Sequence, residues 1–386
     1  MTDPCIQLLQ QLVAIDSVNP SLVPGAAGES AVAAAIAVHM RALGLDVHLQ
    51  DVLPGRPNVI GVLDSGVPGP SLMFCGHTDT VGVEGMADPF SPVLRDGRLY
   101  GRGSQDMKSG LAAMIDAARV LRDRRPAQGR LILAAVIDEE FASAGADALV
   151  REWTADAAVV TEPTDLQIGV GHKGFAWFEI ETLGRAAHGS RPNDGRDAIV
   201  RMGRVLARLE ALDGQLQAGR RHPLMGTASL HASTIDGGRE WSSYPDRCRL
   251  QMERRTIAGE SAAGAEAEIQ AILQALRDAD PEFEASARLA FSRPPYETPQ
   301  GHELTRAIER CAAARRVEST TTGMSFWTDA AVLGEAGIPS ILFGPGGAGL
   351  HSIEEYVRVD EVIACRDVLA DLADGWLGSA KSGAGS

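Results

Sequence analysis

Apolar segments typical of β-strands alternate with amphipathic helical segments through the first half of the chain. Helical spacing marks residues 7–15, 31–43 and 110–121, and strand-like runs mark residues 58–62, 71–75, 131–137, 157–160 and 168–170. Strands separated by helices favour a mostly parallel sheet with helices on both faces. The sequence therefore predicts an α/β fold.

The pattern changes between residues 174 and 288. Here the order is strand 175–183, helix 197–212, strands 227–235 and 248–256, helix 262–276 and strand 284–291. The order β-α-β-β-α-β is that of a ferredoxin-like α+β domain. Because the helix-and-strand alternation resumes near residue 303, we expect a discontinuous catalytic domain, residues 1–173 and 289–386. The inserted domain would then span residues 174–288.

Charge and hydropathy exclude several classes of protein. The net charge of −15 argues against a nucleic-acid partner or an anionic membrane surface, both of which call for a basic face. No apolar run approaches the roughly 18 residues that a membrane span needs. The first residues lack the basic and apolar pattern of a signal peptide. The stretch 378–386, rich in Gly, Ser and Ala, is typical of disorder.

The five cysteines are spread along the chain and form no C-x-x-C pair. They are Cys5, Cys75, Cys248, Cys311 and Cys365. Such spacing is typical of free thiols in a reducing compartment rather than of a disulfide framework. We therefore expect a cytoplasmic protein.

Five short segments rich in His, Asp and Glu lie at the end of an expected strand, in the loop after it or just before a helix. They contain His77 with Asp79, Asp106, Asp138-Glu139-Glu140, Glu162 and His351. Open α/β sheets bind their ligands at the carboxyl ends of the strands. The segments therefore indicate one shared site, although each alone is a weak signal.

The chemistry of these side chains assigns them roles. Asp79, two residues beyond His77, is placed to accept the second ring N–H of a metal-bound imidazole. Asp106 has two oxygens and can bridge two ions. Three consecutive acids after a buried strand are costly without cations. Because neighbouring side chains on extended backbone point to opposite sides, we assign Glu140 as a ligand and Glu139 as the general base.

The full ligand set is then His77, Asp106, Glu140, Glu162 and His351. Two zinc ions bring four positive charges against three carboxylates, which leaves a modestly positive site able to hold hydroxide and polarise a carbonyl. Nitrogen and oxygen ligands without thiolate fit two catalytic Zn²⁺ ions per subunit, and Co²⁺ or Mn²⁺ can substitute.

In this order the five segments resemble the dinuclear zinc family of acetylornithine deacetylase, succinyl-diaminopimelate desuccinylase, aminoacylase and bacterial glutamate carboxypeptidase. The resemblance runs from about residue 5 to residue 365. It implies a zinc-peptidase-like catalytic domain with an inserted dimerisation and lid domain. It also implies that Asp106 bridges the ions, that His77 with Glu162 and Glu140 with His351 complete the two sites, and that Glu139 is the base.

The same resemblance assigns residues of the inserted domain. His188, in Gly184-Arg185-Ala186-Ala187-His188-Gly189, would reach the active site of the partner in a homodimer and stabilise the oxyanion. Arg255 would grip a substrate carboxylate. Ser242 stands where the family tends to have Asn, and Ala258 stands where it often has Pro.

These assignments predict a metal-dependent hydrolase of an amide bond in a small N-acyl amino acid, similar to acetylornithine deacetylase. The glutamate at position 162 is more like the deacetylase and desuccinylase branch than the carboxypeptidase branch. Succinyl-diaminopimelate desuccinylase and glutamate carboxypeptidase activities remain alternatives. A binding protein on a decayed enzyme fold is the non-enzymatic alternative.

Overall fold

The computed structural model describes residues 3–378, so the stretch 379–386 of the tail expected to be disordered lies outside the described residues. The chain divides into two compact units. Unit 1 comprises the described parts of Met1–Val170, Thr298–Thr322 and Thr328–Ser386, and unit 2 comprises Gly171–Glu297 and Gly323–Trp327. The expected insertion, residues 174–288, lies within unit 2, which also contains 171–173, 289–297 and 323–327, all expected in the catalytic domain.

The main sheet of unit 1 is mixed and parallel only at its centre. Its order is β1 (Asp46–Leu53), β2 (Arg56–Asp64), β6 (Arg130–Val136), β3 (Ser71–His77), β7 (Ala157–Val160), β17 (Ser340–Leu342) and β8 (Ile168–His172). Strands β6, β3, β7 and β17 run parallel, whereas β1, β2 and β8 pair antiparallel. The mostly parallel sheet expected from the sequence is thus confined to the centre, because the short Pro54-Gly55 connection forces β1 and β2 into a hairpin.

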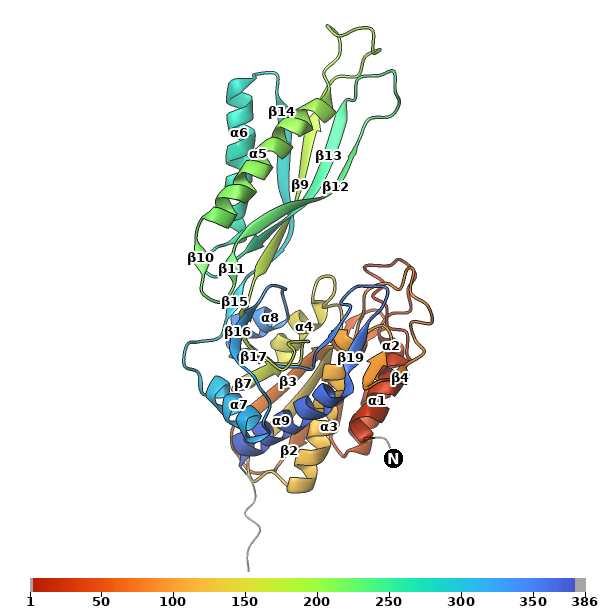
Figure 1. Ribbon diagram of the computed structural model, residues 1–386, viewed down its shortest axis with the longest axis vertical. Helices are drawn as coiled ribbons and strands as arrows, with labels where there is room; N and C mark the ends of the chain where they lie inside the picture. Colours follow the sequence, from red (N-terminus) through yellow and green to blue (C-terminus); the bar gives the residue numbers. More distant parts are fainter. Residues whose placement is uncertain (1–2, 379–386) are drawn as a thin grey trace, which may run out of the picture. The chain divides into compact units, whose positions relative to one another are not determined.

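Helices cover both faces of this sheet (Figure 1). They are α1 (Pro4–Val13), α2 (Ser30–Ala42), α3 (Ser109–Arg124), α4 (Ala144–Glu152), α7 (Glu303–Ala314), α8 (Ala330–Glu335) and α9 (Val359–Leu377). On β2, the Asn58 side chain donates a hydrogen bond to the Gly145 carbonyl of α4, so this position faces α4. Gly61, three residues further along, packs so closely against Met40 of α2 that a Cβ atom there would contact it. An odd separation along a strand places these neighbours on opposite faces. Across residues 3–378, no helix combines the length and hydropathy needed to cross a bilayer.

A small antiparallel sheet in unit 1 brings two distant chain segments together. It consists of β18 (Gly347–Ala348), β19 (Tyr356–Arg358), β5 (Arg98–Tyr100) and β4 (Val93–Arg95), in that order. Tyr356 pairs with Tyr100 and Arg358 with Arg98. Since β5 precedes the Asp106 segment and β19 follows His351, this pairing fixes the two segments against each other.

Unit 2 is a four-stranded antiparallel sheet with two helices. Its elements are β9 (Gly174–Leu183), α5 (Ala198–Ala218), β12 (Ser229–Gly237), β13 (Arg247–Thr256), α6 (Ala262–Ala279) and β14 (Glu284–Arg293). The order β12-β13-β9-β14 is that of a ferredoxin-like fold, as the sequence pattern predicts. Alternate residues of β9, such as Phe178 and Ile180, pack with Met202 of α5 and Ile269 of α6 in one core.

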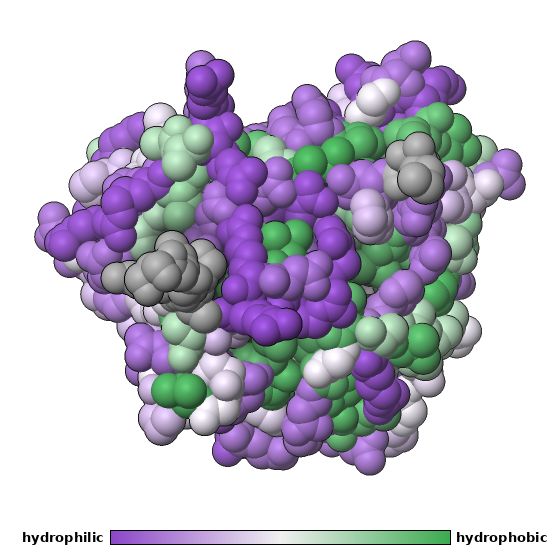
Figure 2. Space-filling model, turned by 90° about the horizontal axis from the view of Figure 1, so that it is seen from below, coloured by the Kyte–Doolittle hydropathy of each residue, from purple (hydrophilic) through white to green (hydrophobic). Residues whose placement is uncertain are grey.

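One face of the molecule carries both hydrophilic and hydrophobic residues. Figure 2 shows hydrophilic and hydrophobic residues interspersed over the face seen from below.

All five cysteines are free thiols, and four of them are buried. Neither unit therefore depends on a disulfide bond, because each has its own apolar core.

Candidate metal centre

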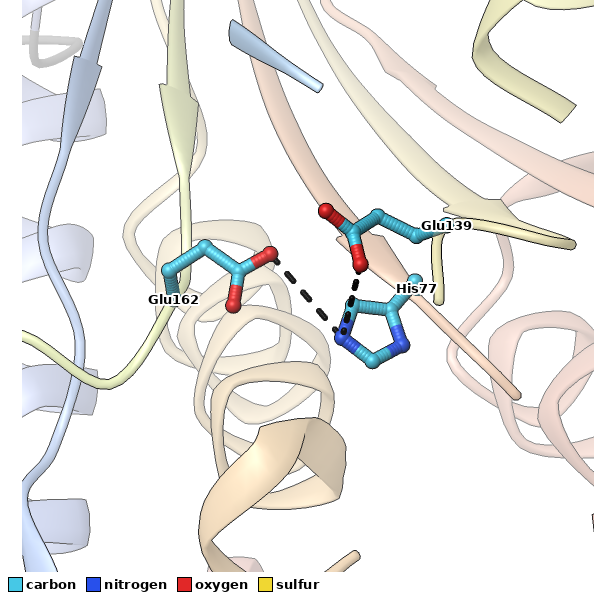
Figure 3. Close-up of side chains that lie close together, drawn as sticks. All are labelled: His77, Glu139 and Glu162. Carbon is cyan, nitrogen blue, oxygen red and sulfur yellow. Dashed lines mark ion pairs between the residues drawn. The ribbon is translucent and has the colours of Figure 1, made fainter. Parts of the chain in front are cut away.

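The first half of the centre surrounds the imidazole of His77, the last residue of β3. Its Nε2 atom lies 3.0 Å from Oδ1 of Asp106 and 3.9 Å from carboxylate oxygens of both Glu139 and Glu162. Figure 3 shows the two glutamates facing the same ring nitrogen from either side. Only 1% of the His77 surface is exposed, so this nitrogen and its carboxylates meet in a site largely shielded from water.

The second half of the centre surrounds His351. Its Nε2 atom lies 3.2 Å from Oε2 of Glu140 and 3.5 Å from Oδ2 of Asp106. The two oxygens of Asp106 therefore face different histidines, Oδ1 toward His77 and Oδ2 toward His351. The structure thus gathers all five residues of the expected ligand set within one cluster.

The sheet explains why residues so far apart in the sequence meet. Strands β6, β3 and β7 are neighbours and run parallel, so Glu139, His77 and Glu162 follow the same edge of the sheet. Asp106 lies in a tight turn, Ser104–Lys108, at the start of α3, and the peptide bond after it is cis. His351 has a φ of 56° in the loop that the small sheet holds nearby.

The acids of the centre are buried at high electrostatic cost. Burial raises the pKa of Glu139 and Glu162 well above the usual value, and it also raises the pKa of Glu140. Burial alone would lower the pKa of His77, but its hydrogen bonds with Asp106 and Asp79 raise that pKa well above normal. Burial is the main cause of the glutamate shifts, and the neighbouring carboxylates add to it; bound divalent cations would offset both effects.

The donor atoms fit such cations. One oxygen of Glu140, Oε1, is buried and has no hydrogen-bond partner. Two sets of donor atoms lie within 4.8 Å of one another: His77 with Glu139 and Glu162, and His77 with Asp106 and Glu140. Imidazole nitrogen and carboxylate oxygen are ligands that suit zinc, cobalt and manganese. Both sets share His77, and the second histidine, His351, lies 3.2 Å from Glu140 and 3.5 Å from Asp106, so the arrangement is a candidate dinuclear metal centre.

The backbone at the acidic turn differs from the sequence-based expectation. Strand β6 ends at Val136, and Asp138 has a left-handed φ of 67°. The amides of Phe141, Ala142 and Ser143 all bond the Asp138 carbonyl, which closes a tight turn. The expectation of extended backbone at Glu139 and Glu140 is therefore wrong, because the chain turns here, and each glutamate brings a carboxylate oxygen within 4.8 Å of a ring nitrogen of His77.

Asp79 contacts both His77 and this acidic turn. The Nδ1 atom of His77 lies 3.0 Å from the backbone carbonyl of Asp79 and 3.5 Å from its carboxylate. The same carboxylate accepts hydrogen bonds from the amides of Glu139, at 3.2 Å, and Glu140, at 3.1 Å. Asp79 thus orients both the imidazole and the acidic turn. Its contact with the turn does not follow from the sequence spacing.

Arg56, which the sequence reasoning missed, contacts the same turn through Asp138. Its guanidinium donates two hydrogen bonds of 2.6 Å to Glu29 and one of 2.9 Å to Asp138. Asn19 accepts a hydrogen bond from Arg56 and donates to Asp79 and Asp138. All five side chains are buried, and no spacing rule links them. Arg56 therefore neutralises a buried acidic network under the candidate centre.

Replacing Arg56 with Met is expected to lower the free energy of unfolding by about 3–5 kcal/mol, because it leaves two buried carboxylates without their cation. Urea denaturation measures the change. Arg122, whose side chain is 39% exposed and pairs with Asp123, provides the matched control: its change to Met should cost about 1 kcal/mol or less. Equal effects of the two substitutions would contradict this view of Arg56.

The three residues expected to bind substrate lie in unit 2 and form two groups. His188 and Ser243 form a β-bridge, and the amide of Gly189 bonds the Ser242 carbonyl at 2.6 Å, so His188 and Ser242 are neighbours. Both residues lie past the Arg247 end of β13. At this end the amide of Gly184 donates a hydrogen bond to the carbonyl of Asp246. Arg255 lies eight residues along this strand, about 26 Å away at the usual rise.

Arg255 is held by an acidic and an aromatic neighbour. Its Nε atom donates a hydrogen bond of 2.6 Å to Glu253, and its guanidinium lies 5.6 Å from the ring centre of Phe175. Glu253 also accepts a hydrogen bond from the indole of Trp177. These contacts fix the orientation of Arg255 while its side chain remains 29% exposed.

Comparison with known proteins identifies related sequences over almost the whole chain. The N-formyl-4-amino-5-aminomethyl-2-methylpyrimidine deformylase of Bacillus subtilis (strain 168) is 29% identical, over 96% of this chain and 94% of that protein. The acetylornithine deacetylase of Photorhabdus laumondii is 28% identical, over 96% and 97%. That of Myxococcus xanthus is 30% identical, over 83% and 84%.

Solved structures share the fold at lower identity. An M20 family metallo-carboxypeptidase from Sulfolobus solfataricus has a TM-score of 0.79 at 16% identity and covers 97% of this chain and 100% of its own. A dinuclear metal-binding peptidase of the M20 family from Bacillus subtilis has a TM-score of 0.74 at 17% identity, with 96% of each chain covered. A family model described as Peptidase family M20/M25/M40 matches residues 73–375, and the resemblance inferred from the five segments is confirmed. The chain belongs to peptidase family M20/M25/M40 and is a metal-dependent amidohydrolase.

Proposed function

We propose that this protein is a two-zinc deacylase that removes an acyl group from the nitrogen of a small N-acyl amino acid, with acetylornithine-type substrates ranked first. The observation that carries the proposal is the convergence of His77, Asp106, Glu140, Glu162 and His351, beside Glu139, in a site whose first half is buried and whose His351 is exposed. Two acetylornithine deacetylases among the relatives support the choice of substrate class. The free thiols fit the cytoplasmic location that we propose.

The chain's own residues divide the work of the reaction. Asp106 would lie between the two ions, His77 and Glu162 would hold one, and Glu140 and His351 the other. Bound zinc supplies a Lewis acid and lowers the pKa of a water molecule to about 7. Glu139, whose carboxylate faces His77 from a shielded position, accepts a proton from the attacking water and delivers it to the leaving amine.

Residues of unit 2 would recognise the substrate. Arg255, oriented by Glu253, has guanidinium N–H groups left to bind a carboxylate in the bidentate manner that arginine favours. His188 would stabilise the oxyanion of the tetrahedral intermediate. Ser242 is a neighbour of His188 and would contact the same part of the substrate.

The distance between these groups supports a homodimer. One small substrate cannot touch both His188 and Arg255 of a single chain, because most of the length of β13 separates them. We propose that each substrate contacts Arg255 of one chain and His188 of the other. The dimer would then be required for activity, since neither chain alone completes a site.

Mixing two inactive variants tests this arrangement. A His188→Ala chain keeps its metal centre, and a Glu139→Gln chain keeps its His188, so a mixed dimer restores one complete site. Random reassociation should recover activity at about a quarter of all sites. Light scattering confirms the dimer in each sample. If the mixture stays as inactive as its parents, although mixed dimers form, His188 acts within its own chain.

An N-formyl amide is a second candidate substrate. The deformylase of Bacillus subtilis covers this chain as fully as the acetylornithine deacetylases do, at 29% identity. Its name describes an N-formyl aminopyrimidine, which has no carboxylate for Arg255 to bind. The pairing of Arg255 with Glu253 partly neutralises the arginine and is compatible with such a substrate.

A hydrolysis panel distinguishes the candidates. The purified enzyme, supplied with zinc or cobalt, is tested on N-acetylornithine, N-succinyl-diaminopimelate, an N-formyl aminopyrimidine and dipeptides ending in glutamate. Release from acetylornithine, with none from the succinyl compound, supports the proposal. Release from the formyl compound alone supports the second candidate. Two bound metal ions without turnover of any of these amides would overturn the proposal in favour of a binding protein.

A further inference from the structure

Glu355 makes an unusual set of contacts four residues after His351. Its side chain is 1% exposed, and its two oxygens accept four hydrogen bonds. Oε1 accepts from the amides of Gln105, at 2.8 Å, and Asp106, at 3.1 Å. Oε2 accepts from the amide of Gly103, at 2.9 Å, and from the guanidinium of Arg102, at 2.8 Å. The Glu355 carboxylate thus accepts hydrogen bonds from three backbone amides of the turn that carries Asp106 and from the Arg102 side chain.

Arg102 extends these contacts to the loop that carries His351. Its Nη2 atom donates to the Ser352 carbonyl at 2.9 Å, and its Nε atom donates to the Gly82 carbonyl at 3.2 Å. The backbone carbonyl of Glu355 accepts a further hydrogen bond from the Gly101 amide. The Arg102–Glu355 pair is therefore bonded to two of the three segments that supply candidate ligands to the second half of the centre, the turn of Asp106 and the loop of His351.

The contacts of the Arg102–Glu355 pair involve mainly the second half of the centre, the half around His351. The hydrogen bonds of this pair reach the Asp106 turn, the loop after His351 and Gly82, whereas the other ring nitrogen of His77 is held by Asp79. Glu162 follows β7 and is fixed by the parallel sheet. Removing Glu355 would therefore release the turn of Asp106 and the loop of His351, which carry two of the three ligands of the second half, whereas the first half shares only Asp106 and keeps the other supports of His77 and Glu162.

We propose that Glu355 is a positioning residue that sets the affinity of one of the two metal ions, the one held by Glu140, His351 and Asp106. The proposal rests on the two-metal centre proposed above. Groups that orient metal ligands from behind typically change metal affinity by about 10- to 100-fold when they are removed. Because Glu355 and Arg102 hold the segments of two ligands of this ion but only the shared Asp106 of the other, the loss should be larger for this ion than for the ion at His77 and Glu162.

The test is a metal titration of the full-length chain carrying Glu355→Gln. Glutamine has a single accepting oxygen, and its NH2 group would face backbone N–H donors, so the turn loses at least one hydrogen bond. Isothermal titration with Zn²⁺ or Co²⁺ should show two ions bound by the wild-type protein. The variant should bind the ion at His351 about 10- to 100-fold more weakly and should lose clearly less affinity for the other ion. The visible spectrum of the cobalt protein should lose the contribution of one site.

The neighbouring glutamate supplies the matched control. Glu354 is exposed, and its change to Gln should leave both affinities unchanged. Arg102→Met is the second variant, because it leaves the three amide contacts of Glu355 in place, and it should weaken the same ion by less than Glu355→Gln does. If Glu355→Gln does not fold, Arg102→Met alone decides the question.

The outcomes separate this proposal from the proposed function. A wild-type chain that binds fewer than two ions refutes the dinuclear centre itself. If the wild type binds two ions and Glu355→Gln, or Arg102→Met in its place, binds both as tightly, the positioning role is refuted and the proposed function survives. Equal weakening of both ions would mean that Glu355 supports the fold in general, which also refutes the selective role.

Discussion

Changing Glu139 to Gln is expected to lower kcat by about 100- to 10,000-fold, the usual contribution of a general base, while KM and the content of two metal ions stay close to wild type. Glutamine has nearly the shape of glutamate, so the acidic turn should keep its backbone hydrogen bonds with Asp79. It cannot accept the proton that the attacking water must lose. Steady-state kinetics and elemental analysis of the metal content provide the two measurements.

The position of Glu139 makes this test decisive. Its carboxylate lies 3.9 Å from the Nε2 atom of His77, the same distance as that of Glu162. Distance alone therefore leaves Glu139 as either a base or a ligand. If Glu139→Gln loses one metal ion together with its activity, Glu139 is a ligand and the proposed assignment fails. Glu152→Gln, at an exposed position of α4, should leave both measurements unchanged.

Changing Asp106 to Ala is expected to abolish activity and to reduce the metal content from two ions to fewer than one per chain. Asp106 approaches both histidines, with one oxygen 3.0 Å from His77 and the other 3.5 Å from His351. Its removal takes a ligand from each ion and leaves two histidines with two glutamates. Because metal affinity depends steeply on the number and charge of the ligands, neither ion should survive dialysis.

Elemental analysis after dialysis, together with circular dichroism to confirm the fold, measures this result. Asp123→Ala is a suitable control, because the Asp123 side chain is 57% exposed and pairs with Arg119 and Arg122 of the same helix. A variant without Asp106 that retains two ions would show that this carboxylate does not bridge them. The proposed division of the ligands between the two ions would then have to be abandoned.

The two substitutions report on different properties of the site. Asp106→Ala tests whether the cluster binds metal as a unit, whereas Glu139→Gln tests catalysis at a centre that is already loaded. If Asp106→Ala retains both ions, the protein has no dinuclear centre of the proposed kind. If Asp106→Ala loses its ions but Glu139→Gln remains active, the centre exists and a different group accepts the proton.

Much of the fold follows from local sequence pattern. The helices α3 and α7 and the strands β3, β6 and β7 agree closely with the apolar periodicity of their segments, because a buried face imposes a period of 3.6 or 2 residues. The long helix α9 was missed, although apolar residues such as Val362, Leu369 and Leu372 recur along it at helical spacing. The antiparallel edges of the main sheet depend on strand order, which no local period encodes.

The sequence by itself determined the chemistry of the centre: which histidines and carboxylates follow strand ends, and hence a cluster of hard nitrogen and oxygen donors. Only the tertiary structure decided how those side chains are held. The left-handed turn at Asp138, the support of that turn by Arg56 and the capture of the Asp106 turn by Glu355 join residues up to 253 positions apart. Spacing rules describe neighbours along one strand or helix, whereas these contacts arise because a buried charge must find its partner wherever the fold brings one.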